Sequence, residues 1–293
     1  MAQLKLVWQS KLVLLLVVPF VAASAVLEAH WWAVQAPLVA IWTVGVSLLL
    51  GIVVLKLRAA TPWAATTGFV ITASLMFSTV TFPYEPWHTA LLPVLAVSVL
   101  AHFATRMGRA QKERLNIAEK RRGRGAAQVA ANLGVAALVS NGLVQSFLTD
   151  TNWFARSREV PMPFIVVGLA ALAEAAADTV SSELGQVLSS TPRMITTLRK
   201  AAPGTDGAIS FGGTLAGVAA AGIVALIGSY AVRGDLYTLL VSFAGGVFGL
   251  FFDSLLGATL ERRGWINNDV VNFLSTACAA AFALALMALL PIA

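Results

Sequence analysis

The sequence predicts an all-α polytopic membrane protein with about nine transmembrane helices, and composition and hydropathy pattern together lead to that prediction. Hydrophobic residues make up 58% of the 293 residues and charged residues only 12%, about half the charged share of a soluble domain. Apolar stretches of about 20 residues, each long enough to cross a hydrocarbon core of about 30 Å, follow one another along the chain. The predicted spans are 12–28, 32–55, 63–81, 88–105, 126–148, 161–181, 211–232, 236–257 and 271–291.

The placement of basic residues predicts the orientation of these spans. If the N-terminus is cytoplasmic, every one of the 20 Lys and Arg residues lies in a cytoplasmic segment except Arg156, Arg158 and Arg233. Basic residues favour cytoplasmic loops, so we expect a cytoplasmic N-terminus and an odd number of helices. The net charge of +6 therefore reflects membrane topology, and no nucleic-acid partner is expected.

The chain divides into three regions by composition. Residues 1–105 form an N-terminal four-helix membrane region, 106–124 a basic cytoplasmic linker that can contact anionic lipid, and 125–293 a five-helix catalytic membrane domain rich in small residues. The first apolar segment also resembles a secretory signal, with a basic flank, a short apolar core and small residues. Cleavage there would leave eight spans, but we expect an uncleaved helix.

Carboxylates mark the sixth predicted span. Its sequence places Glu174 and Asp178 four residues apart on one helix face, which Ser182 continues. An ionised carboxylate at the bilayer centre costs about 2.5–3.5 kcal/mol on insertion scales, so such residues are functional candidates by default. Glu183 lies closer to the end of the helix, where a charged side chain can also extend to the interface. We therefore expect Asp178 in particular to have a function.

Polar residues also gather at the cytoplasmic ends of the other spans from the fifth to the ninth. Asp253 lies between two glycines at a spacing of four, and Asn268 and Asn272 share a stripe with Asp269 beside it. The other members of the set are Arg124, Gln128 and Asn132 at the start of the fifth span, and Lys200, Gly204, Thr205, Asp206 and Gly207 in the loop after the sixth. Glycines in such a loop allow backbone N–H groups to approach a ligand.

A cytoplasmic site between helices explains why these residues share one side of the membrane. Carboxylate and amide oxygens suit Mg2+, which keeps water and substrate phosphates among its ligands. Arginine and lysine suit phosphate oxygens. Phosphoryl transfer requires little beyond such positioning and charge neutralisation, so the pattern favours a phosphoryl-transfer site.

The same blocks resemble a known family. They read GRGAAQVAANLGVAAL, ADTVSSELG, PRMITTLRKAAPGTDGAISFGGTLAG, FFDSLLGATLERRG and INNDVVNFLST, in that order. They are similar to the successive blocks of the family that contains plant phytyl-phosphate kinase and the eukaryotic transmembrane protein 19. The resemblance covers about residues 121–291. It implies a membrane enzyme that phosphorylates a prenyl monophosphate to the diphosphate with a nucleoside triphosphate, and the family is reminiscent of membrane enzymes that use CTP.

The resemblance also implies roles for residues of this chain. It places Asp178, Asp253 and Asp269 as catalytic groups, either metal ligands or a base, and adds Glu183 to the Mg2+ ligands. The residues that it and the spacing together place at nucleotide or phosphate are Arg124, Gln128, Asn132, Ser182, Lys200, Gly204, Thr205, Asp206, Gly207, Asn268 and Asn272. The expected partners are a prenyl (phytyl or geranylgeranyl-type) monophosphate lipid, a nucleoside triphosphate and membrane lipids. The expected location is a bacterial inner membrane, with the active site facing the cytoplasm.

Two other functions stay open at this point, with a non-enzymatic scaffold as a third and weakest option. A CTP-dependent cytidylyltransferase acting on a lipid phosphate would use the same metal and phosphate groups. A lipid or ion transporter would use intramembrane carboxylates as an ion path, but it predicts broken helices and ionisable residues near the midplane of both halves. The candidates in this sequence lie toward one boundary instead, which disfavours a transporter.

Overall fold

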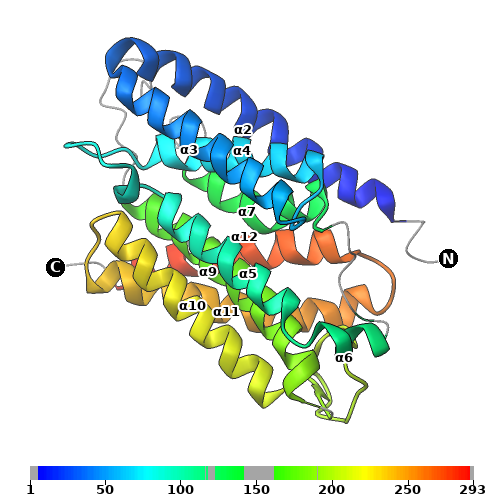
Figure 1. The fold of residues 1–293 in the computed structure, drawn as a ribbon. Helices are drawn as coiled ribbons and strands as arrows, with labels where there is room; N and C mark the ends of the chain where they lie inside the picture. The colour runs from blue at the N-terminus through cyan, green and yellow to red at the C-terminus, as the bar shows by residue number, and fades with distance from the viewer. Residues whose placement is uncertain (1–5, 116, 118–122, 142–161, 190, 291–293) are drawn as a thin grey trace.

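The computed structural model describes residues 6–115, 117, 123–141, 162–189 and 191–290 as a bundle of helices with a small hairpin at one end (Figure 1). The elements are α2 (Val7–Gln35), α3 (Pro37–Lys56), α4 (Pro62–Ser78), η1 (Pro86–His88), α5 (Leu91–Arg106), α6 (Arg109–Arg114), α7 (Ala126–Val139), α9 (Met162–Leu188), β1 (Arg193–Met194), β2 (Ala208–Ile209), α10 (Phe211–Ala231), α11 (Leu236–Leu256), η2 (Gly257–Glu261) and α12 (Asn268–Leu289). The two short strands pair antiparallel, with Arg193 opposite Ile209.

The prediction of an all-α polytopic membrane protein is confirmed, apart from that hairpin. Each predicted apolar segment contains one described helix, although α2 continues to Gln35 and α3 begins only at Pro37. Within the described residues, six helices are long and apolar enough to cross a membrane: α2, α3, α9, α10, α11 with η2, and α12. The described parts of α4, α5 and α7 are shorter, and the second part of the predicted span 126–148 lies outside the described residues. The count of nine crossings therefore stays a prediction.

Side-chain caps fix where four helices begin. Thr61 accepts a hydrogen bond from the backbone N–H of Ala64 at the start of α4, and Ser210 accepts one from Gly213 at the start of α10. Asp235 begins α11 and Asn267 begins α12 in the same way. Such caps satisfy backbone N–H groups that have no partner inside the helix. They set the ends of the helices that carry the polar residues discussed below.

Helix α9 lies at the centre of the bundle and packs against α5, α7, α10, α11 and α12 (Figure 1). Most of its side chains from Ile165 to Val180 are buried, and many are alanine. Small residues on the neighbouring helices allow this close packing: a Cβ on Gly217 of α10 would lie 2.7 Å from the Ala177 carbonyl oxygen, and one on Gly249 of α11 would overlap the Glu174 side chain. Small residues in membrane helices permit such backbone approach.

One hydrophobic core joins helices from both ends of the sequence. It includes Val17 of α2, Ile71 of α4, Val94 of α5, Ala136 of α7 and Leu172 of α9. Helix α7 packs against α2 and α4 on one side and against α9 and α12 on the other. The predicted division at residues 106–124 stays a prediction, but the packing continues across it.

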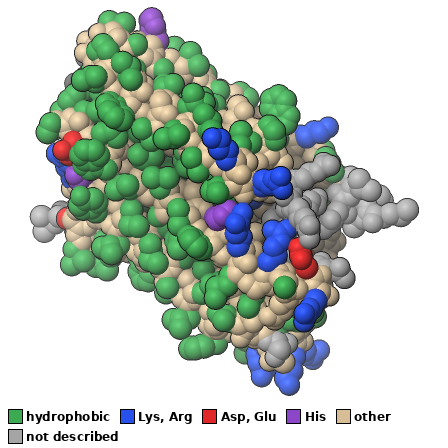
Figure 2. Space-filling model, viewed as in Figure 1, with side chains coloured by type: hydrophobic (Ala, Val, Ile, Leu, Met, Phe, Trp, Pro, Cys, Tyr) green, Lys and Arg blue, Asp and Glu red, His purple; other side chains and the backbone are tan. Residues whose placement is uncertain are grey.

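The end of the bundle that carries β1 and β2, called the hairpin end below, is basic. Hydrophobic side chains cover most of the face seen in Figure 2, whereas Lys and Arg side chains gather toward this end. Large apolar side chains such as Leu15, Leu38 and Leu226 are exposed on the outer helices, as expected where lipid is the solvent. A basic end favours the predicted cytoplasmic orientation.

Candidate functional site

A polar cavity of about 400 Å³ lies at the hairpin end, between α7, α9, α11, α12 and the loop that joins β1 to β2. Of the residues predicted for the site, it is lined by Arg124, Gln128, Asn132, Asp178, Ser182, Glu183, Gly204, Thr205, Asp206, Gly207, Asp253, Asn268 and Asn272. The structure therefore brings together residues that are far apart in the sequence. It does not bring Asp269 or Lys200 into the lining.

Three carboxylates from α9 and α11 meet at the inner wall of this cavity. Asp178 and Asp253 line it, and Glu174, one turn before Asp178, is 1% exposed behind them. Asp253 interacts electrostatically with both other carboxylates. Oε1 of Glu174 and Oδ2 of Asp253 are buried and have no hydrogen-bond partner among the described residues. Buried carboxylate oxygens without donors are costly, so this wall is suited to a cation.

The α7 face of the cavity carries the cationic group. Arg124, Gln128 and Asn132 all line it, but only Gln128 and Asn132 share a face of α7, because the helix begins at Ala126 and Arg124 lies in the extended segment before it. The Arg124 backbone is fixed by two hydrogen bonds to the turn between α3 and α4: its N–H donates to Ala59 and its carbonyl accepts from Thr61, both at 3.0 Å. The Arg124 guanidinium interacts favourably with the Asp178 carboxylate. Arg124 therefore faces the acidic wall from the segment that leads into α7.

The glycine-containing loop closes the cavity on the side away from the bundle. Gly204 and Gly207 have φ values of +79° and +72°, which favour glycine. Gly207 also packs so closely against the π-helical turn η2 that a Cβ would overlap the Ala258 backbone. Partial burial raises the pKa of Asp206 in this loop, although the Arg262 guanidinium opposes the shift. The loop is thus fixed against α11, with backbone groups at the cavity.

The beginning of α12 shows why Asp269 does not reach the cavity. Asn268 and Asn272 line it, but Asp269 accepts a hydrogen bond from the Ser10 hydroxyl of α2 at 2.6 Å. Neighbouring helical residues project in directions about 100° apart, so Asn268 and Asp269 cannot face the same space. Asn267 strengthens the contact with α2 by donating to Oγ of Ser10 at 3.0 Å. Asp269 therefore joins two helices.

Two other predicted residues have different surroundings from those expected. Lys200 is exposed beside the hairpin, in a backbone bridge with Arg193, and is not among the residues that line the cavity. Glu183 lines the cavity, yet it already accepts hydrogen bonds from Lys112 Nζ at 2.5 Å and from the Thr105 hydroxyl at 3.1 Å. Lys112 is 1% exposed, so this is a buried ion pair. Its cation neutralises the Glu183 carboxylate.

Sequence reasoning missed one carboxylate in the lining, Glu261 at the end of η2. Its side chain is close enough to interact with Asp206, Asp178 and Asp269. The sequence does contain an indication of this position, because Asp253, Gly257 and Glu261 are spaced four residues apart and so lie on one helix face. Two arginines follow Glu261 directly, so its carboxylate is easily taken for part of a mixed-charge cytoplasmic turn.

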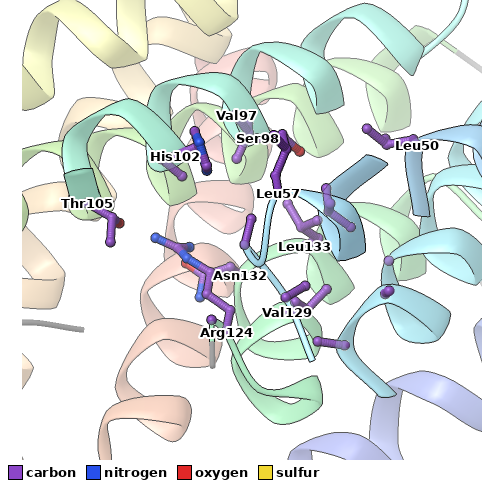
Figure 3. Close-up of a pocket in the computed structure, with 18 of the residues that line it drawn as sticks. Leu50, Leu57, Val97, Ser98, His102, Thr105, Arg124, Val129, Asn132 and Leu133 are labelled. Atoms are coloured by element: carbon purple, nitrogen blue, oxygen red, sulfur yellow. The ribbon is translucent and has the colours of Figure 1, made fainter. Parts of the chain in front are cut away.

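A second, apolar cavity of about 410 Å³ lies next to the polar one, between α3, α4, α5 and α7 (Figure 3). Arg124 and Asn132 line both cavities. Figure 3 shows Asn132 of α7 and Arg124, just before that helix, opposite His102 and Thr105 of α5. The two cavities therefore meet at α7, one polar and one apolar.

The carboxylates of the polar cavity do not form a complete metal cage on their own. Among the described residues, no three His, Cys, Asp or Glu side chains are grouped so that they could hold a metal ion by themselves. Asp178, Asp253 and Glu174 supply oxygens from one wall only. Mg2+ commonly binds in this way, through one or two carboxylates, and completes its shell with water and substrate phosphates.

Comparison with known proteins gives the family. The model of the integral membrane protein family DUF92 matches residues 45–280. The chain is 46% identical over 108 residues to uncharacterized membrane protein MJ0933 of Methanocaldococcus jannaschii, covering 37% of this chain and 45% of that protein. It is 34% identical over 206 residues to uncharacterized membrane protein sll0875 of Synechocystis, covering 67% and 73%. It is 30% identical over 189 residues to Protein VTE6, chloroplastic, of Arabidopsis thaliana, covering 63% and 54%.

The fold and the two cavities define a polytopic membrane protein with a polar site at one end of its helix bundle. The chain belongs to the DUF92 family of integral membrane proteins. The predicted membership of the family of phytyl-phosphate kinase and transmembrane protein 19 is confirmed. The chain spans about half the length of MJ0933 and of VTE6. No solved structure matches it.

Proposed function

We propose that the protein is a membrane kinase that transfers the γ-phosphoryl group of a nucleoside triphosphate to a prenyl monophosphate, giving the diphosphate. The observation that carries the proposal is the meeting of the two cavities at Arg124 and Asn132. A prenyl monophosphate has an apolar chain and an anionic head, and a nucleotide is polar throughout. Adjacent apolar and polar cavities that share an arginine suit that pair of substrates. Family membership supports the same reaction.

The finer details of the proposal come from sequence. The resemblance to membrane enzymes that use CTP favours CTP as the phosphoryl donor. The basic hairpin end favours a cytoplasmic site, with the N-terminus on the same side and nine crossings. A bacterial inner membrane is the proposed location.

Mg2+ fits the acidic wall because Glu174 Oε1 and Asp253 Oδ2 are buried oxygens without donors. Asp178 and Asp253 would hold the ion, with Glu174 adding negative charge behind them. When bound, Mg2+ would neutralise charge on the β- and γ-phosphates of the donor. Glu183 and Asp269 are less suited to be ligands, because Lys112 and Ser10 already bind their carboxylates.

The remaining groups of the cavity position phosphates. Arg124 can donate two parallel hydrogen bonds to phosphate oxygens. The loop at Gly204 and Gly207 places backbone near the donor, and Asn268 and Asn272 offer amide groups from α12. In the reaction, a terminal oxygen of the prenyl monophosphate bonds to the γ-phosphorus, and the bond from that phosphorus to the β-phosphate oxygen breaks. The nucleoside diphosphate leaves.

This acceptor needs little help from a general base. The second pKa of a phosphate monoester is about 6, so its attacking oxygen is mostly deprotonated at neutral pH. Asp178 and Asp253 are therefore better assigned to charge and metal binding than to proton removal. The protein would therefore catalyse the reaction mainly by aligning the two anionic substrates, the lipid monophosphate and the nucleotide, which would otherwise repel each other.

The test is a turnover assay of purified protein in nanodiscs with phytyl or geranylgeranyl monophosphate, Mg2+ and labelled nucleoside triphosphates. Transfer of γ-label to a lipid diphosphate is the expected result, and the series of nucleotides identifies the donor. Formation of a CDP-lipid with release of pyrophosphate would show a cytidylyltransferase instead. If neither phosphoryl transfer nor nucleotide binding is found, a transporter becomes the remaining hypothesis.

A further inference from the structure

The apolar cavity has a polarity gradient along its length. Helix α5 lines it with Val94, Val97, Ser98, Ala101, His102, Thr105 and Arg106 in order toward the hairpin end. The lining is thus mostly apolar inside the bundle, includes two polar side chains midway, and is basic at the opening. The twelve residue-to-residue steps from Val94 to Arg106 correspond to about 18 Å along the helix axis. That depth is similar to one leaflet, half of a hydrocarbon core of about 30 Å.

Arginines gather at the shallow end of this cavity. Arg58, Arg106, Arg109 and Arg124 all line it. They come from the end of α3, the end of α5, the start of α6 and the segment before α7. Arg109 pairs with Glu113 at 3.1 Å and Arg106 donates to the Leu57 carbonyl at 3.2 Å. Even so, this gathering of basic residues at an apolar opening fits a ligand that carries an anion on a hydrocarbon chain. A nucleotide, polar throughout, does not fit the apolar interior.

The two lining residues that this cavity shares with the polar cavity indicate which anion this is. Arg124 and Asn132 have one side toward each cavity, so a phosphate at Arg124 would lie at the boundary between them (Figure 3). From there, the head of the ligand would be next to the acidic wall, and its chain would extend toward Leu50 and Val94. A phospholipid with two acyl chains is a poorer fit to a single cavity of about 410 Å³.

We propose that the cavity between α3, α4, α5 and α7 holds the hydrocarbon chain of the phosphorylated acceptor, with its phosphate at Arg124, and sets the accepted chain length. This inference rests on the proposed kinase function for the identity of the acceptor. The inner residues Leu50, Thr72 and Val94 limit the chain. Gly68 of α4 lies midway along the wall and keeps the cavity wide.

The substitution Gly68→Leu tests the proposal. A Cβ at Gly68 would meet only the Val129 side chain, at 3.9 Å, so the first added carbon displaces no backbone. Because Gly68 lines the cavity, the rest of the leucine side chain would take up space in it. Thr66→Leu is the matched control, because Thr66 is exposed on the same helix and does not line the cavity. The quantity to measure is the ratio of kcat/KM for geranylgeranyl monophosphate to that for dimethylallyl monophosphate.

We expect Gly68→Leu to lower that ratio at least about tenfold, as occurs when a hydrophobic pocket loses room for several carbons, and Thr66→Leu to keep the wild-type ratio. A wild-type ratio in folded Gly68→Leu protein would overturn the proposal, whether the two rates stay unchanged or fall together.

A second measurement separates this proposal from the kinase function. A geranylgeranyl monophosphate carrying a diazirine near the chain end is crosslinked to the protein in nanodiscs without nucleotide. Labelling of α4 and α5 that Gly68→Leu removes supports the chain site, even if no phosphoryl transfer is found. Phosphoryl transfer accompanied by labelling only of the outer surfaces would support the kinase and overturn the chain site.

Discussion

The substitution Asp253→Asn tests the acidic wall of the polar cavity, because it removes one negative charge and keeps the shape of the side chain. Oδ2 of Asp253 is buried without a partner, and Asp178 and Glu174 lie close enough to repel the carboxylate. The same change should therefore have opposite effects on activity and on stability. Turnover should fall, because an electrostatic contact to the Mg2+–nucleotide complex is lost, while the free protein should become more stable.

Both magnitudes can be worked from the site. Removal of one preorganised electrostatic group from an active site costs about 2.7–4 kcal/mol, or a factor of about 10²–10³ in kcat. Two like charges at about 4 Å repel by about 4 kcal/mol at an effective dielectric constant of 20. Relief of even a fraction of that repulsion in Asp253→Asn should raise Tm in the absence of Mg2+. In the wild-type protein, Mg2+ should raise Tm by binding the same oxygens.

The assay is the γ-phosphoryl transfer described above, combined with thermal unfolding with and without Mg2+. Asp235→Asn is the matched control, since it makes the same chemical change at the other end of α11. Asp235 caps the helix by accepting from the Thr238 N–H at 2.9 Å, and asparagine also caps well. This control should keep wild-type turnover and the wild-type response to Mg2+. Wild-type turnover in Asp253→Asn at saturating Mg2+ would refute the reasoning.

Three further predictions concern the surroundings of the cavity. Gly207→Ala should reduce turnover at least about tenfold, because its φ of +72° and its contact with η2 leave no room for a Cβ. A kcat close to the wild-type value would show that the loop is not part of the site. Ser10→Ala should destabilise the protein by about 1–3 kcal/mol, because the Asp269 carboxylate loses its hydrogen-bond donor. The same substitution should change kcat by less than about tenfold. Loss of all turnover in folded protein would instead indicate that Asp269 is a catalytic residue. The pKa of Asp235 is lowered because the Thr238 N–H and hydroxyl donate to it, so its stabilisation is present above about pH 4 and lost as pH falls through the lowered pKa. In unfolding scans from neutral to acid pH, the Tm difference between wild-type and Asp235→Asn should change in that acidic window only, and a change near neutral pH would contradict the assignment.

Helix positions could be predicted from the sequence because apolar runs in a membrane leave the backbone little choice but to form helices. Helical spacing also predicted the shared face of Gln128 and Asn132 on α7, whereas Arg124, before the helix, reaches the same cavity through its backbone bonds to Ala59 and Thr61. Local spacing is sufficient for Gln128 and Asn132. The same holds for Asp178 and Ser182 on α9.

The surroundings of Asp269, Glu183 and Glu261 could not be predicted in this way, because distant residues determine them. The donor to Asp269 is Ser10, which lies 259 residues earlier. The cation beside Glu183 is Lys112, whose place inside the bundle depends on α6 packing against α9. The side chain of a charged residue at a helix end can point in several directions, and the packing of the complete bundle determines which direction it takes.

The apolar cavity was also beyond sequence reasoning, since it requires α3, α4, α5 and α7 to be placed together. Its position bears on the extent of the functional unit. The recognisable motifs lie within residues 121–291, but the family model begins at residue 45, within α3. The backbone of Arg124 is held by Ala59 and Thr61, and the wall of the apolar cavity includes α4 and α5. A polar site alone would not need those helices, whereas a site that accepts a lipid phosphate requires a place for the chain beside Arg124. The N-terminal helices are therefore expected to contribute to substrate selection, and the motif-containing helices to the reaction itself.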